Sequence, residues 1–200
     1  MWLAMRGHFE KIGPYYFYLV PGLLDFEKRS LEFYEKFFDT EIIKLPAPAI
    51  YKFLNEMIFC APERCATIEA ANMPEPTKDE FAEWLREDHE LPDAYNAIGI
   101  RIQDSLARRA MLRKIGPINE KRKTFYPVWD MNKDALIDLI KRTGCKLPED
   151  YRIMGSSFDS LTYRYLKPIS VHYPQDYKRI LHWYPLADLA IYRREVLQNG

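Results

Sequence analysis

The stretch YYFYLVPGLLDFEKRSLEFYEKFFDTEIIKLPAP, residues 15–48, decides the fold. It begins with a continuous run of aromatic and β-branched residues closed by Pro21 and Gly22, which predicts a buried strand over 15–21. Apolar residues at helical spacing follow, with charges between them, and they predict an amphipathic helix. A second strand then ends at prolines. A strand, a helix and a strand within about thirty residues are typical of a parallel sheet.

The rest of the chain alternates short strands with helices. Thr77 and Glu80 have the spacing of a capping box, which predicts an exposed helix inside an acidic, proline-rich insertion at about 70–95. Asn132 and Gly144 are suited to begin and end another helix. The other predicted elements are a helix over 49–62, strands over 96–102 and 125–129, a helix over 104–116, and helices near 174–183 and 185–198. The sequence therefore predicts an α/β fold with a parallel sheet and a mostly helical C-terminal third.

The composition is that of a globular chain with one domain, or one domain and a small appendage. The 200 residues are 48% hydrophobic and carry 29 basic and 29 acidic side chains, so a core can form and the net charge is zero. A neutral chain is not suited to coating DNA or an anionic membrane. Three cysteines without an apolar leader before them predict a cytoplasmic location. No apolar stretch has the length of a membrane span, so no membrane partner is expected.

The segment NAIGIRIQDSLARRA, residues 96–110, places three arginines where a predicted strand meets a helix. Asp104 and Ser105 are both suited to cap that helix, whose first N–H groups carry the positive end of its dipole. Arg101 at the strand end and Arg108 in the helix would add guanidinium groups, which fit a tetrahedral phosphate or sulfate. The alternative is that Asp104 and Arg108 form a simple ion pair four residues apart, with Arg109 and Arg113 on a solvated face.

Three blocks of the sequence resemble a known family. IGIRIQDSLARR, residues 98–109, is similar to the Gly-x-Arg-x-x-(Asp/Glu)-Ser-x-x-Arg segment of the phosphoadenosine phosphosulfate (PAPS) reductase family, in the adenine nucleotide α-hydrolase-like, or ATP pyrophosphatase, superfamily. FYPVWDMNKDALIDLIKRTGCKLPEDY, residues 125–151, resembles the Tyr-Pro segment of that family, which ends in Leu-Pro-x-x-Tyr. GSSFDSLTYRYLKPISVHYPQDYKRILHWYPLADLAIYRRE, residues 155–195, resembles the C-terminal region of phage- and plasmid-encoded members.

This resemblance implies a fold, a ligand and a set of binding residues. The fold would be an incomplete HUP-like (Rossmann-like) three-layer nucleotide-binding core at 1–130, with a helical, tyrosine-rich region at 131–200 packed on it. The arginine segment would hold the phosphate or sulfate end of an adenine nucleotide, ATP or PAPS, as the cofactor. Likeness to phage-type members implies a phage or mobile-element protein in the host-cell cytoplasm. The implied binding residues are Arg101, Asp104, Ser105, Arg108 and Arg109.

Two motifs of that family are missing from the sequence. The Ser-Gly-Gly-x-Asp-Ser loop, whose backbone amides cradle phosphates, does not occur, and the chain is expected to begin just after its position. The C-terminal Glu-Cys-Gly-x-His tail is also missing, since no cysteine follows Cys145. Three cysteines are too few for an iron–sulfur cluster. Catalytic residues therefore remain unassigned, no metal site is expected, and enzymatic activity is an open question.

The C-terminal third is rich in tyrosine and arginine. These residues are favoured in protein interfaces and can also stack on nucleic-acid bases, with an interface as the preferred interpretation. Two hypotheses for function follow. The chain is a PAPS reductase-like protein that binds a nucleotide, or it is a structural or interaction module. In the second case its C-terminal helices bind a protein partner or form a homo-oligomer.

Overall fold

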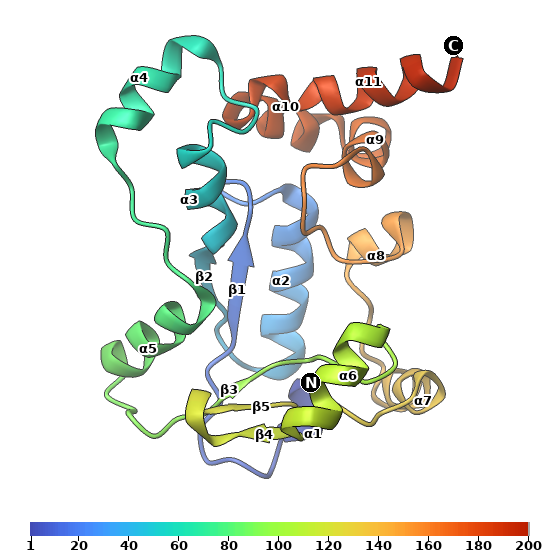
Figure 1. The fold of residues 1–200 in the computed structure, drawn as a ribbon. Helices are drawn as coiled ribbons and strands as arrows, with labels where there is room; N and C mark the ends of the chain where they lie inside the picture. Colours follow the sequence, from blue (N-terminus) through green and yellow to red (C-terminus); the bar gives the residue numbers. More distant parts are fainter. Residues whose placement is uncertain (200) are drawn as a thin grey trace. The chain divides into compact units, whose positions relative to one another are not determined.

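The computed structural model describes residues 1–199, which form two compact units (Figure 1). The first unit combines Met1–Ile12 with Thr77–Lys146. The second combines Gly13–Pro76 with the chain from Leu147 onward. The fold is α/β, with mostly helix and two small sheets.

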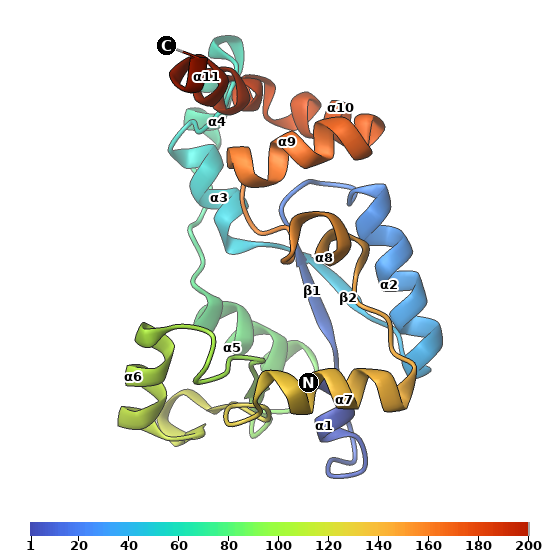
Figure 2. The ribbon, with the colours of Figure 1, turned by 90° about the vertical axis from the view of Figure 1, so that its right-hand side faces the viewer.

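The strand–helix–strand arrangement predicted from the opening stretch is confirmed in the second unit. β1 (Tyr15–Tyr18) and β2 (Ile43–Pro46) form a parallel two-stranded sheet. α2 (Asp25–Phe38) connects them and runs beside the strands in Figures 1 and 2. Phe26, Glu27 and Leu31 on α2 are buried, and the last two are four residues apart, so one side of this helix faces the core.

Helices make up the rest of the second unit. α10 and α11 confirm the helices predicted near 174–183 and 185–198, and α11 begins three residues later than expected, after a 3₁₀ turn. α9 lies outside the predicted elements because Pro168 inside it is a helix-breaking signal. The bounds are α3 (Pro48–Asn55), α4 (Pro62–Ala71), α8 (Glu149–Met154), α9 (Tyr163–His172), α10 (Pro174–Trp183), η2 (Pro185–Ala187) and α11 (Asp188–Asn199).

The core of the second unit joins the end of β1 to these C-terminal helices. Leu166 and Ile169 on α9 and Ile180 on α10 are fully buried. The Tyr184 hydroxyl, at the end of α10, donates a hydrogen bond of 2.9 Å to the carbonyl of Leu19. Burial of apolar side chains, at about 25 cal/mol per Å², is therefore the main force that holds the C-terminal third on the βαβ motif.

The first unit contains a three-stranded sheet and several helices. β5 lies between the other strands, parallel to β3 and antiparallel to β4. The caps predicted from sequence are confirmed, since Thr77 accepts from the Glu80 N–H and Asn132 accepts from the Ala135 N–H. The bounds are α1 (Trp2–Met5), α5 (Lys78–Asp88), β3 (Asn96–Ala97), α6 (Leu106–Ile115), β4 (Ile118–Asn119), η1 (Glu120–Arg122), β5 (Thr124–Phe125) and α7 (Lys133–Thr143).

Several predicted elements are shorter than expected. The strand expected over 96–102 spans two residues and pairs with β5, so it does not extend the sheet of β1 and β2. A three-layer core around one parallel sheet is therefore not confirmed. The helix expected over 49–62 ends at Asn55, because Met57 and Phe59 adopt left-handed φ angles of 53° and 57° that a helix cannot contain. Of the strand expected over 125–129, only its first residue lies in β5.

The two units also divide the chain differently from the expected division after residue 130. That position lies within the first unit, which continues through α7 to Lys146. The insertion expected at about 70–95 contains the boundary between the units, which lies between Pro76 and Thr77. Its exposed helix, α5, belongs to the first unit.

Candidate functional site

The arginines singled out in the sequence lie in and just after the turn that precedes α6. Ser105 is the N-cap of this helix, and its Oγ accepts a hydrogen bond of 3.1 Å from the Arg108 N–H. The Ser105 carbonyl accepts from the Arg109 N–H at 3.0 Å. The N–H groups of Leu106 and Ala107 precede the first intrahelical hydrogen bond, so they have no partner within α6.

Asp104 ties two of the arginines together. Its Oδ1 accepts from Arg101 Nε at 3.1 Å and from Arg101 Nη2 at 2.9 Å. Its Oδ2 accepts from the Arg101 backbone N–H at 2.9 Å and from Arg108 Nη1 at 3.3 Å. Burial opposes ionisation of Asp104, but the hydrogen bonds from Arg101 and the charges of both arginines outweigh it and hold the pKa of this carboxyl below its ordinary value. Asp104 is therefore a permanent anion that fixes the turn.

The turn keeps unused donors and positive charge after this pairing. Arg101 Nη1 is buried and has no hydrogen-bond partner among the described residues. The Arg108 side chain is 49% exposed and uses one nitrogen on Asp104. Arg109 Nε donates to the Ile102 carbonyl at 3.4 Å. Three guanidinium groups against one carboxylate leave the cluster with an excess of two positive charges.

The structure thus brings Arg101, Asp104, Ser105 and Arg108 together, while Arg109 bonds to the Ile102 carbonyl and not to Asp104. Of the two alternatives open from sequence, the ion pair between Asp104 and Arg108 is present. It does not exclude anion binding, because the carboxylate bonds to the arginines and not to the first N–H groups of α6. Binding of an anion here stays a prediction.

A second helix N-terminus, that of α2, carries polar groups that the sequence analysis does not assign. Asp176 on α10 accepts from the Asp25 N–H at 2.6 Å and from the Phe26 N–H at 3.3 Å. Asp176 is 2% exposed, and Arg179 Nη1 lies 3.3 Å from it. These partners are 151 residues apart in sequence, so no local pattern predicts them. This N-terminus is closed by the protein's own carboxylate.

Glu27 is the second buried carboxylate at this end of α2. Its Oε2 accepts from the Leu24 N–H at 2.8 Å, and its Oε1 accepts from the Tyr16 hydroxyl at 2.6 Å. Burial raises the pKa of Glu27 to about 7; its two hydrogen bonds oppose this rise, and the negative charges of Asp150 and Asp176 add to it. The one local sequence signal for this role of Glu27 is its place at the third position of a predicted helix, where a capping box has a glutamate.

The cysteines and carboxylates do not form a metal centre in the described part of the chain. No group of three or more His, Cys, Asp or Glu side chains suited to a metal occurs within residues 1–199. Cys60, Cys65 and Cys145 are free thiols, and burial raises the pKa of Cys60 and of Cys145. These two thiols are therefore poorly disposed to act as nucleophiles at neutral pH.

Comparison with known proteins gives no relative. No family model, no curated protein and no solved structure matches this chain. Within residues 1–199 no helix combines the length and apolar character needed to cross a membrane. The interpretation of the site therefore depends on its own geometry and on the sequence resemblance.

Proposed function

We propose that the chain is a PAPS reductase-like protein, of the type encoded by phages and mobile elements, that binds an adenine nucleotide through its phosphate or sulfate end. The binding edge would be the turn before α6, with Arg101, Ser105 and Arg108 as its main groups. The HUP-like core and a place in the cytoplasm belong to the same proposal. The observation that carries it is the arginine pair held by Asp104 beside the free first turn of α6.

The chemistry of these groups suits a tetrahedral oxyanion. The N–H groups at the start of α6 and the helix dipole favour negative charge at that point. The Arg101 Nη1 is buried, so the donors open to an anion are the remaining nitrogens of the half-exposed Arg108 and the first N–H groups of α6. Because Asp104 already fixes the Arg101 guanidinium, little side-chain entropy would be lost on binding. The proposal concerns binding, and no side chain is assigned to a bond-breaking step.

Calorimetric titration tests this proposal. PAPS, adenosine phosphosulfate and ATP are compared with adenosine, which lacks the anionic end. We expect the nucleotides to bind more tightly than adenosine, and Arg101→Ala and Arg108→Ala each to weaken them about tenfold, the value of one charge-assisted hydrogen bond. Arg113→Ala is the matched control, since this exposed arginine lies on the same helix. Equal binding by the wild type, Arg101→Ala and Arg113→Ala would contradict the proposal.

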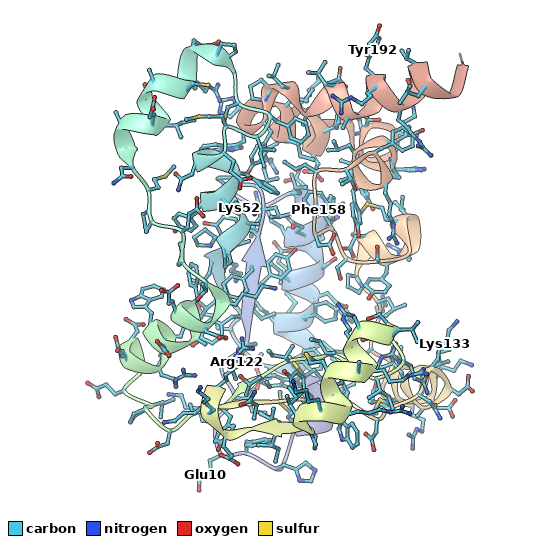
Figure 3. All side chains as sticks on the ribbon, viewed as in Figure 1. Glu10, Lys52, Arg122, Lys133, Phe158 and Tyr192 are labelled. Atoms are coloured by element: carbon cyan, nitrogen blue, oxygen red, sulfur yellow. The ribbon has the colours of Figure 1, made fainter. Side chains whose placement is uncertain are left out.

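The exposed face of α11 supports a second candidate function, that of an interaction module. Leu189, Tyr192 and Val196 are 52%, 66% and 50% exposed. Their spacing of three and four residues places them on one side of the helix, and Tyr192 points away from α11 in Figure 3. A row of exposed apolar side chains with tyrosine is typical of a protein interface.

Sedimentation velocity tests this second candidate. If α11 forms a homo-oligomer, the wild type sediments as a larger species and Tyr192→Asp as a monomer. The control is Lys167→Gln, which changes an exposed ion pair with Glu195 on the adjoining helices. If the wild type is a monomer at all concentrations, α11 does not form a homo-oligomer, and an interaction module would have to bind a different protein.

A further inference from the structure

A surface pocket of about 280 Å³ lies in the first unit, away from the turn before α6. Its walls come from α5 and from the turn that includes η1. The side chains that line it and carry charge are Asp79, Glu83, Arg86, Lys121, Arg122 and Lys123. Four of these are basic and two are acidic, so the lining has an excess of positive charge although the chain as a whole is neutral.

The turn that presents the basic residues is fixed by its own hydrogen bonds. Asn119 Oδ1 accepts from the Arg122 N–H at 3.2 Å and caps η1. Lys123 adopts a left-handed φ of 44°, and its Nζ donates to the Pro92 carbonyl at 2.6 Å and to Asp93 Oδ1 at 3.0 Å. The Thr124 hydroxyl donates to the Arg122 carbonyl at 3.1 Å. The backbone that carries Lys121 and Arg122 is therefore fixed before any ligand arrives.

The charges of the pocket divide into paired and unpaired groups. Arg122, labelled in Figure 3, reaches from the turn to Asp79 on α5, where Nη2 and Oδ1 are 2.5 Å apart. This pair raises the pKa of Arg122 and links the two walls. Lys121 on the turn and Arg86 on α5 have no ion pair or hydrogen bond with other side chains described in the structure. Glu83, one turn before Arg86 on α5, is likewise an unpaired carboxylate among the described residues.

We propose that this pocket binds a small phosphorylated sugar. Two unpaired cations on opposite walls suit a phosphomonoester, which carries up to two negative charges and several acceptor oxygens. The carboxylate of Glu83 accepts hydrogen bonds, so it favours a ligand whose other end carries hydroxyl groups. The volume lies near the lower end of small-molecule sites, about 300–1,000 Å³, and therefore favours a monosaccharide over a dinucleotide. This inference is independent of the nucleotide site proposed above.

Ribose 5-phosphate is the probe, with ribose and inorganic phosphate as its two halves, each titrated calorimetrically into the full chain. We expect ribose 5-phosphate to bind more tightly than either half. Arg86→Ala and Lys121→Ala are each expected to weaken it about tenfold, the value of a charge-assisted contact. Glu83→Gln is expected to weaken ribose 5-phosphate and to leave inorganic phosphate unchanged or slightly tighter. This difference would place the sugar next to Glu83.

Two control variants separate this pocket from other basic surfaces. Lys133→Ala, on α7 of the same unit and labelled in Figure 3, removes an exposed lysine outside the pocket and is expected to change nothing. Arg113→Ala, at an exposed arginine of α6 outside the pocket, is also expected to leave ribose 5-phosphate binding unchanged. The proposal is overturned if Arg86→Ala and Lys121→Ala bind the probe like the wild type. It is also overturned if Lys133→Ala weakens binding as much as they do, or if the wild type shows no binding.

Discussion

The N-termini of α2 and α6 use carboxylates in opposite ways. At α2, Asp176 comes from a helix distant in sequence and accepts two backbone N–H groups at the helix start, so the protein itself supplies the anion. At α6, Asp104 bonds to Arg101 and Arg108 and leaves the first N–H groups of the helix without an internal acceptor. A helix N-terminus can receive an external anion only where no internal carboxylate already binds these groups. By this criterion α6 is open to an anion and α2 is closed.

The largest expected effect comes from opening the closed N-terminus. Asp176→Ala leaves the Asp25 and Phe26 N–H groups without their acceptor and removes one of the two carboxylates that bond to Arg179. Two backbone donors left without an acceptor cost about 1–3 kcal/mol each, so with the lost contact to Arg179 the total is about 3–5 kcal/mol. We therefore expect the free energy of unfolding in urea to fall by about this amount. Asp159→Ala, at an exposed aspartate of the same unit, is the control; a loss for Asp176→Ala no larger than for this control would mean that Asp176 does not close α2.

The next largest expected effect is the pH dependence of stability that Glu27, at the same end of α2, produces. The pKa of Glu27 in the folded protein, about 7, lies above its ordinary value of 4.5. The folded state therefore binds more protons than the unfolded state between these values, and stability falls as the pH rises from about 4.5 to 7. The shift corresponds to about 3 kcal/mol for this group.

Glu27→Gln tests this pH dependence, because glutamine keeps the size and the acceptor oxygen of the capping box but does not titrate. Urea unfolding of both proteins at a series of pH values gives the difference between their free energies of unfolding. The titration of all other groups is common to both proteins and cancels in this difference. We expect the variant to gain about 3 kcal/mol relative to the wild type between pH 4.5 and pH 7. A difference that does not change with pH would show that Glu27 titrates normally in the folded state.

At the open N-terminus, removal of the cap has a smaller effect. Ser105→Ala removes the hydrogen bond to the Arg108 N–H, which lies in an exposed turn. Loss of such a cap costs about 1 kcal/mol, and Ser105→Asp, which keeps an acceptor, is expected to restore most of it. Urea unfolding measures both variants. If Ser105→Ala and Ser105→Asp had the same free energy of unfolding, the Ser105 side chain would not be the cap.

The same comparison explains how far the sequence predicts this structure. The cap of α6 is predictable, because Ser105 and the residues it binds are neighbours in the chain. So is the cap of α7, where Asn132 is followed by its partner three residues later. Asp176 is not predictable, because its role depends on the packing of α10 on α2. The strand pairing is not predictable for the same reason. The segment at 96–102 has the composition of a strand, but its pairing with β5 depends on tertiary packing.

The extent of the candidate site is likewise only partly predictable. The spacing of Arg101, Asp104 and Arg108 indicates that they lie close together, and they do. The pattern alone does not tell whether the carboxylate binds the arginines or the helix N–H groups, because both are within reach of an aspartate just before the N-cap. The pocket beside η1 has no sequence signal beyond a short basic run, since four of its seven lining residues come from α5.

The smallest expected effect on stability decides how the binding experiments are interpreted. Arg108 is 49% exposed and its ion pair with Asp104 is long, at 3.3 Å, so Arg108→Ala is expected to change the free energy of unfolding by about 0.5 kcal/mol or less. The same variant is expected to weaken nucleotide binding about tenfold, which corresponds to about 1.4 kcal/mol. Urea unfolding and calorimetry on one preparation measure both quantities. A binding loss well above the stability loss means that Arg108 contacts the anion itself; two losses of equal size would mean that Arg108 only supports the turn.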